Sequence, residues 1–323
     1  MQRFNNILFV SYGVTDESEA LKQALSLARN NKADLKALII CPEFPKEMLD
    51  YKDKYEASLI QQLQASIQAT RDAIKVSETD VPVQIEIENG ATPAIRIVRH
   101  VIKGSHDLVI KEAEAQEGGK GFKAVDLELL RKCPCAVWLA RPIGHHRKEM
   151  KVAVAIDPES MAPEGPTQPL TLRPEGRDLS VRLLQLSRTL ADTCNGELNI
   201  ISCWDYPYEN TLLNSPWIKV TKEELSGLLL EAEKNHRRAL DSIIQESKIG
   251  GALKVHHLRG RVDLMIPESI EKEGCDILVM GTVARTGIYS FIFGNTAENI
   301  LQKVSCSLLA LKPNGFVSPV KAY

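Results

Sequence analysis

The sequence has 323 residues, which is long for one small core and sufficient for two domains. Hydrophobic residues make up 44% and charged residues 25%, as in ordinary globular proteins, and 40 lysines and arginines nearly balance 42 aspartates and glutamates. The resulting net charge of −2 provides no global field that would draw the chain onto nucleic acid or an anionic membrane, so neither partner is expected.

The N-terminal residues lack the features of a secretory leader. The apolar stretch Ile7–Val10 is short, and no small-residue cleavage site follows it. No apolar run approaches the roughly 20 residues that span a bilayer. The seven cysteines are an odd number scattered through strand-like segments, which is typical of reduced core residues in a cytosol. We therefore expect a cytoplasmic protein.

In chain order, the first half alternates short apolar runs with helical patterns. The runs are continuously apolar, as in buried strands, and apolar residues three or four positions apart between them indicate amphipathic helices. The expected strands are Ile7–Gly13, Leu35–Cys41, Val83–Ile87, His106–Ile110 and Cys135–Leu139.

The second half repeats this order of strands and helices. The most similar pair of segments is the fourth expected strand of each copy. Strands that alternate with helices predict a parallel sheet covered on both faces. We therefore predict an α/β protein of two tandem Rossmann-like domains, each with a five-stranded parallel sheet flanked by helices. The expected strands of the second copy are Val152–Ile156, Leu198–Trp204, Lys254–Leu258, Cys275–Val279 and Cys306–Ala310.

The domain boundary is predicted in the polar linker Gly144–Glu149. The first domain then covers residues 1–144, the second 150–314, and a C-terminal tail 315–323. The second copy also carries a proline-rich insertion, Pro158–Arg177, which predicts a loop at the carboxyl end of its first strand. Two interpretations of this loop stay open: a surface loop without a role in binding, and a lid over a ligand.

A glycine-rich segment after the fourth strand of the second copy carries the candidate chemistry. Gly281, Gly287 and Gly294 are followed by Asn295 and Thr296, plausible first-turn residues of the next helix. Phosphate oxygens need converging backbone N–H groups, which a Cβ blocks and a helix N-terminus supplies. The segment predicts a nucleotide-phosphate site, although these glycines could equally shape a strand-to-helix turn.

Here the chain resembles the universal stress protein family across both halves. Nucleotide-binding members carry a loop of the form G-x2-G-x9-G-[S/T]; this chain has Gly281, then Ala284 at the second glycine, then Gly294 followed by Asn295. The Gly-Asn-Thr-Ala-Glu string looks especially like the E-type tandem members. The family also places an acidic residue at the end of the first strand, and Asp157 matches that position.

The resemblance implies an adenine nucleotide alpha hydrolase-like fold and a role in the stress response. It implies ATP or another adenine nucleotide as ligand, with Asp157, Gly281, Gly287, Gly294, Asn295 and Thr296 as site residues. It further implies that the two copies pack as an intramolecular pseudo-dimer; a further homodimer remains open.

The first copy departs from this pattern. Tyr12 stands where Asp157 stands in the second copy, and Lys111–Glu114 replaces Met280–Val283. The carboxylates of this replacement segment would repel phosphate. The first copy is not expected to bind a nucleotide.

Enzyme signatures are absent from the sequence. No G-x-x-x-x-G-K-[ST] loop, G-x-G-x-x-G fingerprint or G-x-S-x-G elbow is present, so a dedicated enzyme is not predicted, and weak ATP hydrolysis remains open. Two other functions compete with nucleotide binding. One is the binding of a non-nucleotide small ligand, with an apolar compound as one option, between the two sheets and beneath the Pro158–Arg177 loop, and the other is a ligand-free scaffold.

No metal site is predicted. Cys133 and Cys135 are expected on one face of a strand as two core cysteines, because further ligands are missing. His256 and His257 are adjacent on a strand and point to opposite faces, which argues against joint ligation.

Overall fold

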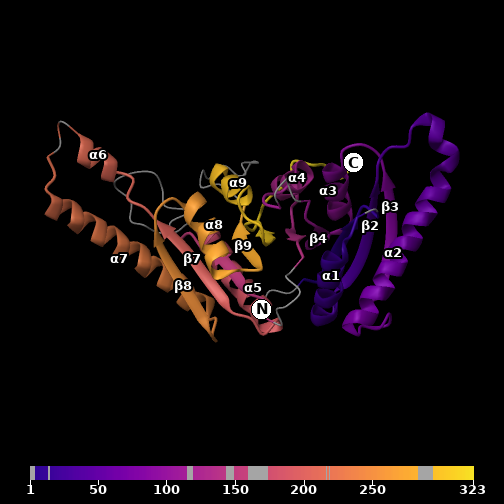
Figure 1. The fold of residues 1–323 in the computed structure, drawn as a ribbon, viewed down its shortest axis with the longest axis horizontal. Coiled ribbons are helices and arrows are strands. Elements are labelled where there is room, and N and C mark those ends of the chain that lie inside the picture. Colours follow the sequence, from indigo (N-terminus) through magenta and orange to yellow (C-terminus); the bar gives the residue numbers. More distant parts are fainter. Residues whose placement is uncertain are drawn as a thin grey trace.

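A computed structural model describes residues 4–13, 15–114, 119–142, 149–158, 174–215, 217, 219–282 and 294–323. Strands and helices alternate along both halves, as predicted (Figure 1). The strands are β1 Asn6–Ser11, β2 Asp34–Cys41, β3 Val83–Asn89, β4 Leu108–Glu112, β5 Ala136–Ala140, β6 Val152–Ala155, β7 Leu198–Trp204, β8 Leu253–Arg259, β9 Ile277–Gly281 and β10 Ser307–Leu311.

The helices connect these strands. They are α1 Ser18–Asn31, α2 Lys52–Ile74, α3 Pro93–Gly104, α4 Ala124–Lys132, α5 Pro174–Thr193, α6 Glu209–Asn214, α7 Lys222–Ser247, α8 Val262–Glu273 and α9 Asn295–Leu301, with a 3₁₀ turn at Lys46–Tyr51. Among the helices that the structure describes, none is both long and apolar enough to cross a membrane.

All ten strands form one sheet in the order β3-β2-β1-β4-β5-β10-β9-β6-β7-β8. The five strands of each half are parallel to one another, which confirms the predicted fold class. The halves meet where β5 and β10 pair antiparallel, with Trp138 opposite Leu309. The hypothesis of a ligand held between two separate sheets is therefore wrong in its geometry, because the sheets join edge to edge.

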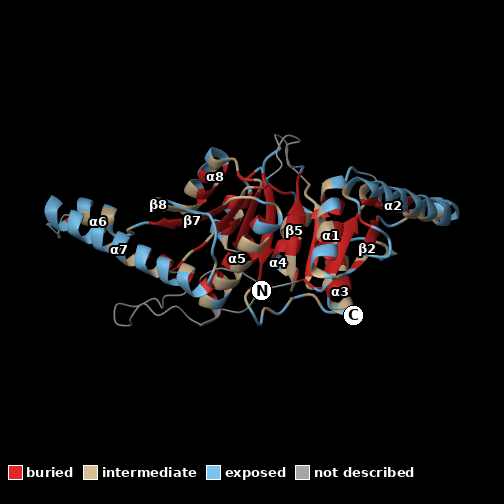
Figure 2. Cartoon of the chain, turned by 90° about the horizontal axis from the view of Figure 1, so that it is seen from below, coloured by how far each residue is buried: buried red, intermediate tan, exposed pale blue. Residues whose placement is uncertain are grey.

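Two hydrophobic cores lie on opposite faces of this sheet. Helices α1, α2, α5 and α7 cover one face, and α3, α4, α8 and α9 cover the other. Successive strand residues point to opposite faces, so Phe9 packs in the first core and Leu8 in the second. In Figure 2 the buried strands cross the middle of the molecule, while α2 and α7 lie exposed at its two ends.

The end of the chain from Lys312 to Tyr323, which includes the predicted tail at 315–323 and is called the tail from here on, crosses back onto the first half. The Lys312 ammonium donates to the Leu130 carbonyl at 2.5 Å, and the Ser318 hydroxyl donates to the Lys132 carbonyl at 2.7 Å. Both acceptors lie in the last turn of α4, where carbonyls lack intrahelical partners. The tail therefore completes a helix of the other domain.

The proline-rich insertion differs in part from its prediction as a loop. Helix α5 begins at Pro174, so the last four residues of Pro158–Arg177 are helical. Proline is tolerated in the first helical turn, where its missing N–H has no intrahelical acceptor. Residues 159–173 lie outside the described part of the chain.

Candidate functional site

The strand order reverses at two places in the sheet, once in each half. In the second half β6 and β9 are neighbours, and the chain leaves β6 toward α5 on one face and β9 toward α9 on the other. Because the two connections diverge, the carboxyl ends of β6 and β9 leave a crevice, which is where open parallel sheets bind ligands.

A cleft of about 710 Å³ occupies this crevice. We call it the second-half cleft. Residues after β6, at the end of β9 and at the beginning of α9 line its edge. Its walls are largely apolar side chains of β9, α5, α8 and α9 and of the segment after β6: Ile156, Leu179, Leu183, Ile266, Met280 and Ile300.

The cleft contains five of the six residues predicted for the site, namely Asp157, Gly281, Gly294, Asn295 and Thr296. The sixth, Gly287, and the departure at Ala284 lie outside the described residues. The structure thus brings the described members together, and their binding of a nucleotide stays a prediction.

Gly281 lies where the floor of the cleft is tight. A Cβ added there would lie 3.1 Å from Leu179 Cδ2, closer than ordinary van der Waals contact. Gly294 is the N-cap of α9, and this cap makes no side-chain hydrogen bond to the first turn. Because glycine has no side chain, both positions present main-chain atoms to the cleft.

A charged group at the rim was missed by the sequence reasoning. The Arg261 guanidinium donates to both carboxylate oxygens of Asp263, at 3.1 and 2.9 Å, and this hydrogen bonding lowers the pKa of Asp263. Arg261 follows Gly260, whose φ of +135° is a conformation that favours glycine. The glycine after the third strand was the available signal, because it turns the next residue toward the cleft.

The corresponding position in the first half is filled by side chains. Strand register places Lys111 opposite Val10, so Lys111 corresponds to Met280 and Glu112 to Gly281. The fully buried Lys111 donates to Asp126 at 2.6 Å. It also donates to the Glu112 carbonyl at 2.8 Å, and its Nζ lies 5.4 Å from the centre of the Tyr12 ring.

Together with nearby carboxylates, these residues form a group that we call the first-half cluster. Its members are Tyr12, Glu17, Lys111, Glu112, Glu114 and Asp126. Burial raises the pKa of Asp126, and the adjacent Lys111 opposes that rise. Burial also raises the pKa of Glu112 to about 7, while its carboxylate accepts from the Ala20 amide at 3.0 Å. Alanine 297 of α9 corresponds to Asp126 of α4 in the alignment of the two halves, so the second half has no equivalent ion pair.

The histidines of β8 behave as their alternation predicts. His257 Nε2 lies 2.9 Å from His236 Nδ1 of α7, whereas His256 Nε2 lies 2.8 Å from Asn199 Oδ1. Within the residues that the structure describes, no group of three or more histidine, cysteine, aspartate or glutamate side chains could hold a metal ion.

The universal stress protein family model matches residues 3–141 and 175–312, so the chain belongs to that family. Its relatives include universal stress protein E of Photorhabdus laumondii, 26% identical over 332 residues that cover 100% of this chain and 99% of the relative. Universal stress protein E of Salmonella typhi is 28% identical, with 99% and 98% covered. The prediction of a tandem family member most like the E type is confirmed.

Solved structures agree with the fold. A putative universal stress protein from Pseudomonas aeruginosa UCBPP-PA14 superposes with a TM-score of 0.67 at 21% identity, covering 97% of this chain and 95% of that one. A universal stress protein from Archaeoglobus fulgidus gives a TM-score of 0.59 at 14% identity, with 96% and 97% covered. The two-domain architecture is therefore shared along the whole chain.

Proposed function

We propose that the second half of this tandem universal stress protein binds ATP or another adenine nucleotide in the second-half cleft. The protein would act in the cytoplasm, and the bound nucleotide would serve as a signal rather than as a substrate that is turned over. The first half would bind no nucleotide.

One observation supports this proposal above the others. The second-half cleft lies at the strand-order reversal, and the five described residues predicted for the site line it together. Its volume of about 710 Å³ falls within the range of small-molecule sites, which are concave and mostly apolar with a few polar groups.

Each part of a nucleotide has a chemical counterpart in the cleft. The aliphatic walls suit the faces of an adenine ring, and the Asp157 carboxylate suits hydroxyls of a ribose, as acidic residues do in other α/β nucleotide sites. Backbone at Gly281 and Gly294 allows phosphate oxygens to approach main-chain amides without meeting a Cβ.

The test is a calorimetric titration of the full chain with ATP and with ADP, as wild type and as three variants. We expect wild-type protein to bind, and Gly294→Val and Asp157→Ala to bind about tenfold more weakly or not at all, because each removes one of the proposed contacts. The matched control is Lys123→Val, which places the same side chain at the N-cap of α4, the counterpart of Gly294 in the first half.

Unchanged affinity in both Gly294→Val and Asp157→Ala would refute the proposal, as would an equal loss in Lys123→Val. Phosphate release is measured on the same samples. Turnover that Asp157→Ala abolishes would make the protein an ATPase instead.

A second candidate function is the binding of an apolar small molecule in the same cleft. The observation that favours it is the concentration of aliphatic side chains from α5 and α8, including Leu179, Leu183 and Ile266. Native mass spectrometry of freshly purified protein separates the candidates, because it shows the mass of any co-purified ligand directly. An apolar compound there, displaced by no nucleotide, would favour this second function.

A further inference from the structure

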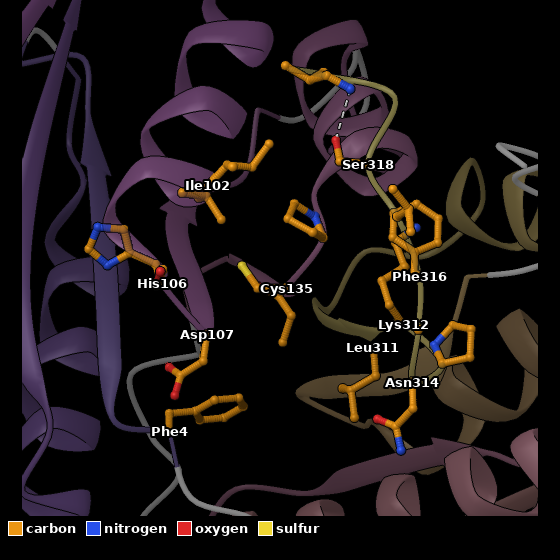
Figure 3. Close-up of a pocket in the computed structure, with 18 of the residues that line it drawn as sticks. Phe4, Ile102, His106, Asp107, Cys135, Leu311, Lys312, Asn314, Phe316 and Ser318 are labelled. Atoms are coloured by element: carbon orange, nitrogen blue, oxygen red, sulfur yellow. Dashed lines mark hydrogen bonds between the residues drawn. The ribbon is translucent and has the colours of Figure 1, made fainter. Parts of the chain in front are cut away.

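A second cavity lies where the two halves and the C-terminal tail meet. It has a volume of about 660 Å³ and is separate from the second-half cleft. We call it the junction cavity. Figure 3 shows His106 and Asp107 on one wall, Lys312 and Phe316 of the tail on the other, and Cys135 between them.

Cys135 belongs to a pair of thiols. Its Sγ lies 3.5 Å from the Sγ of Cys133, within hydrogen-bonding distance for sulfur. Cys133 is the C-cap of α4 and Cys135 directly precedes β5, so the pair lies in the helix-to-strand connection and not on a strand as predicted. Cys133 is fully buried, whereas Cys135 is partly exposed and lines the cavity.

The tail supplies a positive charge beside this pair. Lys312 is buried and donates to the Leu130 carbonyl, and its Nζ lies 4.6 Å from the centre of the Phe316 ring. The hydrogen bond from Cys135 lowers the pKa of Cys133, and the nearby Lys312 charge lowers it further. Burial lowers the pKa of Lys312 itself to about 8. Burial and the adjacent Cys133 raise the pKa of Cys135, so the pair holds a single thiolate, which lies on Cys133 while Cys135 keeps the shared proton.

We propose that Cys133 and Cys135 form a redox-active dithiol that low-molecular-weight disulfides oxidise to an intramolecular disulfide through the junction cavity. Cys135 is the residue that meets the oxidant, and Cys133 is the buried residue that resolves the intermediate. The inference does not depend on nucleotide binding in the second half.

The reaction consists of two thiol–disulfide exchanges. A proton passes from Cys135 to Cys133, and the Cys135 thiolate attacks one sulfur of the small disulfide, which expels one thiolate and leaves a mixed disulfide. Cys133 then loses its proton and attacks Cys135 Sγ, which expels the second thiolate. Two electrons pass from the cysteines to the small disulfide; the one thiol proton of the pair ends on one of the two released small thiols, and the other leaves as a thiolate that takes its proton from water.

The required movement is small. A disulfide bond is about 2.05 Å long, so the two sulfurs must approach by roughly 1.5 Å from their present contact. Cytosolic disulfides of this kind are usually transient and serve catalysis or redox sensing. A reversible dithiol is therefore compatible with the cytoplasmic location proposed above.

The second half provides an internal control. Cys306 precedes β10 as Cys135 precedes β5, but Val304 stands where Cys133 stands in the first half. Burial raises the pKa of Cys306 to about 12. Cys194, which is partly exposed, is a second control, and burial raises the pKa of its thiol as well.

The test treats reduced full-length protein with oxidised glutathione, stops the reaction with acid, and maps the products by mass spectrometry after alkylation. We expect the wild-type peptide that contains both thiols to lose two hydrogen atoms and to acquire no adduct. Reaction at Cys194 and Cys306 should be at least about tenfold slower, because within the described part of the chain neither makes a thiol–thiol hydrogen-bonding contact like the one of 3.5 Å that joins Cys133 and Cys135, through which a proton can pass and a mixed disulfide can be resolved.

Two serine variants separate the steps. Cys133→Ser should accumulate a stable glutathione adduct on Cys135, because the resolving thiol is missing, whereas Cys135→Ser should leave Cys133 unmodified. Circular dichroism before oxidation verifies that each variant is folded. A glutathione adduct on wild-type Cys135 without the internal disulfide would overturn the proposal, and so would oxidation no faster than at Cys194.

Lys312→Met tests the role of the tail. Removal of its charge should slow disulfide formation several-fold, whereas Lys312→Arg, the residue type found at the matching position Arg141, should largely restore the rate. Equal rates in all three proteins would contradict the assigned role of the tail.

Discussion

The two halves share one strand order and differ most at the point where that order reverses. In the second half, Met280, Gly281 and Ala297 leave room for a cleft. In the first half, Lys111, Glu112 and the buried carboxylate of Asp126 occupy the corresponding positions. In the described residues, the position that lines a cleft in the second half is occupied in the first half by a buried ion pair.

The first-half cluster also shows how charged side chains can occupy this position without loss of the fold. Burial of a lysine is costly unless the charge is paired and hydrogen-bonded. Lys111 meets that condition through Asp126 and the Glu112 carbonyl, and Asp126 also accepts from the Glu114 amide at 2.8 Å. Substitutions that give one half the residues of the other therefore test whether these differences decide stability and binding.

The largest expected effect comes from breaking the ion pair of the first half. Asp126→Ala leaves Lys111 buried without its partner and should lower the free energy of unfolding by about 3–5 kcal/mol. The double variant Lys111→Met with Asp126→Ala copies the second half and should recover most of that loss. Urea denaturation measures both, and a single variant within about 1 kcal/mol of wild type would show that the pair is not required.

A smaller effect is expected when Gly281 of the second half is replaced by glutamate, the residue found at the corresponding position, Glu112, in the first half. Gly281→Glu introduces a carboxylate into the second-half cleft and brings its Cβ against Leu179. ATP affinity should fall about tenfold or more through repulsion and crowding. Gly281→Gln has nearly the same shape without the charge, so its calorimetric titration separates the two causes. An equal loss in both variants would assign the effect to crowding alone.

The first-half cluster should also give a pH dependence of stability. Burial raises the pKa of Glu112 from the usual 4.5 to about 7, so the folded chain holds this proton more tightly than the unfolded chain. Its contribution to stability is complete below the unfolded-state pKa and is lost as pH rises through the folded-state pKa.

Glu112→Gln removes this titration and keeps an oxygen for the Ala20 amide. Relative to wild type, the variant should therefore gain stability as pH rises from about 5 to about 8. Urea denaturation at the two pH values measures the gain. A difference between the two proteins that is the same at both pH values would show that Glu112 does not titrate in this way.

The smallest effect concerns an ion pair between the halves. Arg131 of α4 and Glu298 of α9 lie 2.7 Å apart, and their side chains are 42% and 28% exposed. Such pairs contribute about 0.2–1 kcal/mol, less at high salt, so Glu298→Gln should lower stability by no more than this. A larger loss in urea denaturation would mean that the junction depends on this contact more than on the pairing of β5 and β10.

Much of the fold followed from the sequence because most of the buried parallel strands are apolar runs; β3 and β8, which lie at the two edges of the sheet, alternate or carry polar residues instead. The antiparallel joining of β5 and β10 did not follow. Their apolar runs look the same whether the neighbour is parallel or antiparallel, and the pairing partner lies in the other half of the chain.

The site was predicted in part for a similar reason. Asp157 and Gly281 stand at strand ends and Gly294 at the beginning of a helix, where sequence position predicts location. Arg261 was missed because only the positive φ of Gly260 brings it to the rim. The pairing of Lys111 with Asp126 was missed because the partner lies on a later helix, although a lysine inside an apolar strand was a signal that a buried counter-charge must exist.

The most direct test of the central claim is the stoichiometry of ATP binding in wild-type protein and in the double variant Met280→Lys with Ala297→Asp, which carries the ion pair of the first half into the second-half cleft. Our account predicts one nucleotide per wild-type chain and none in the variant at the same concentrations. Two nucleotides per wild-type chain, or undiminished binding in a folded variant, would contradict it.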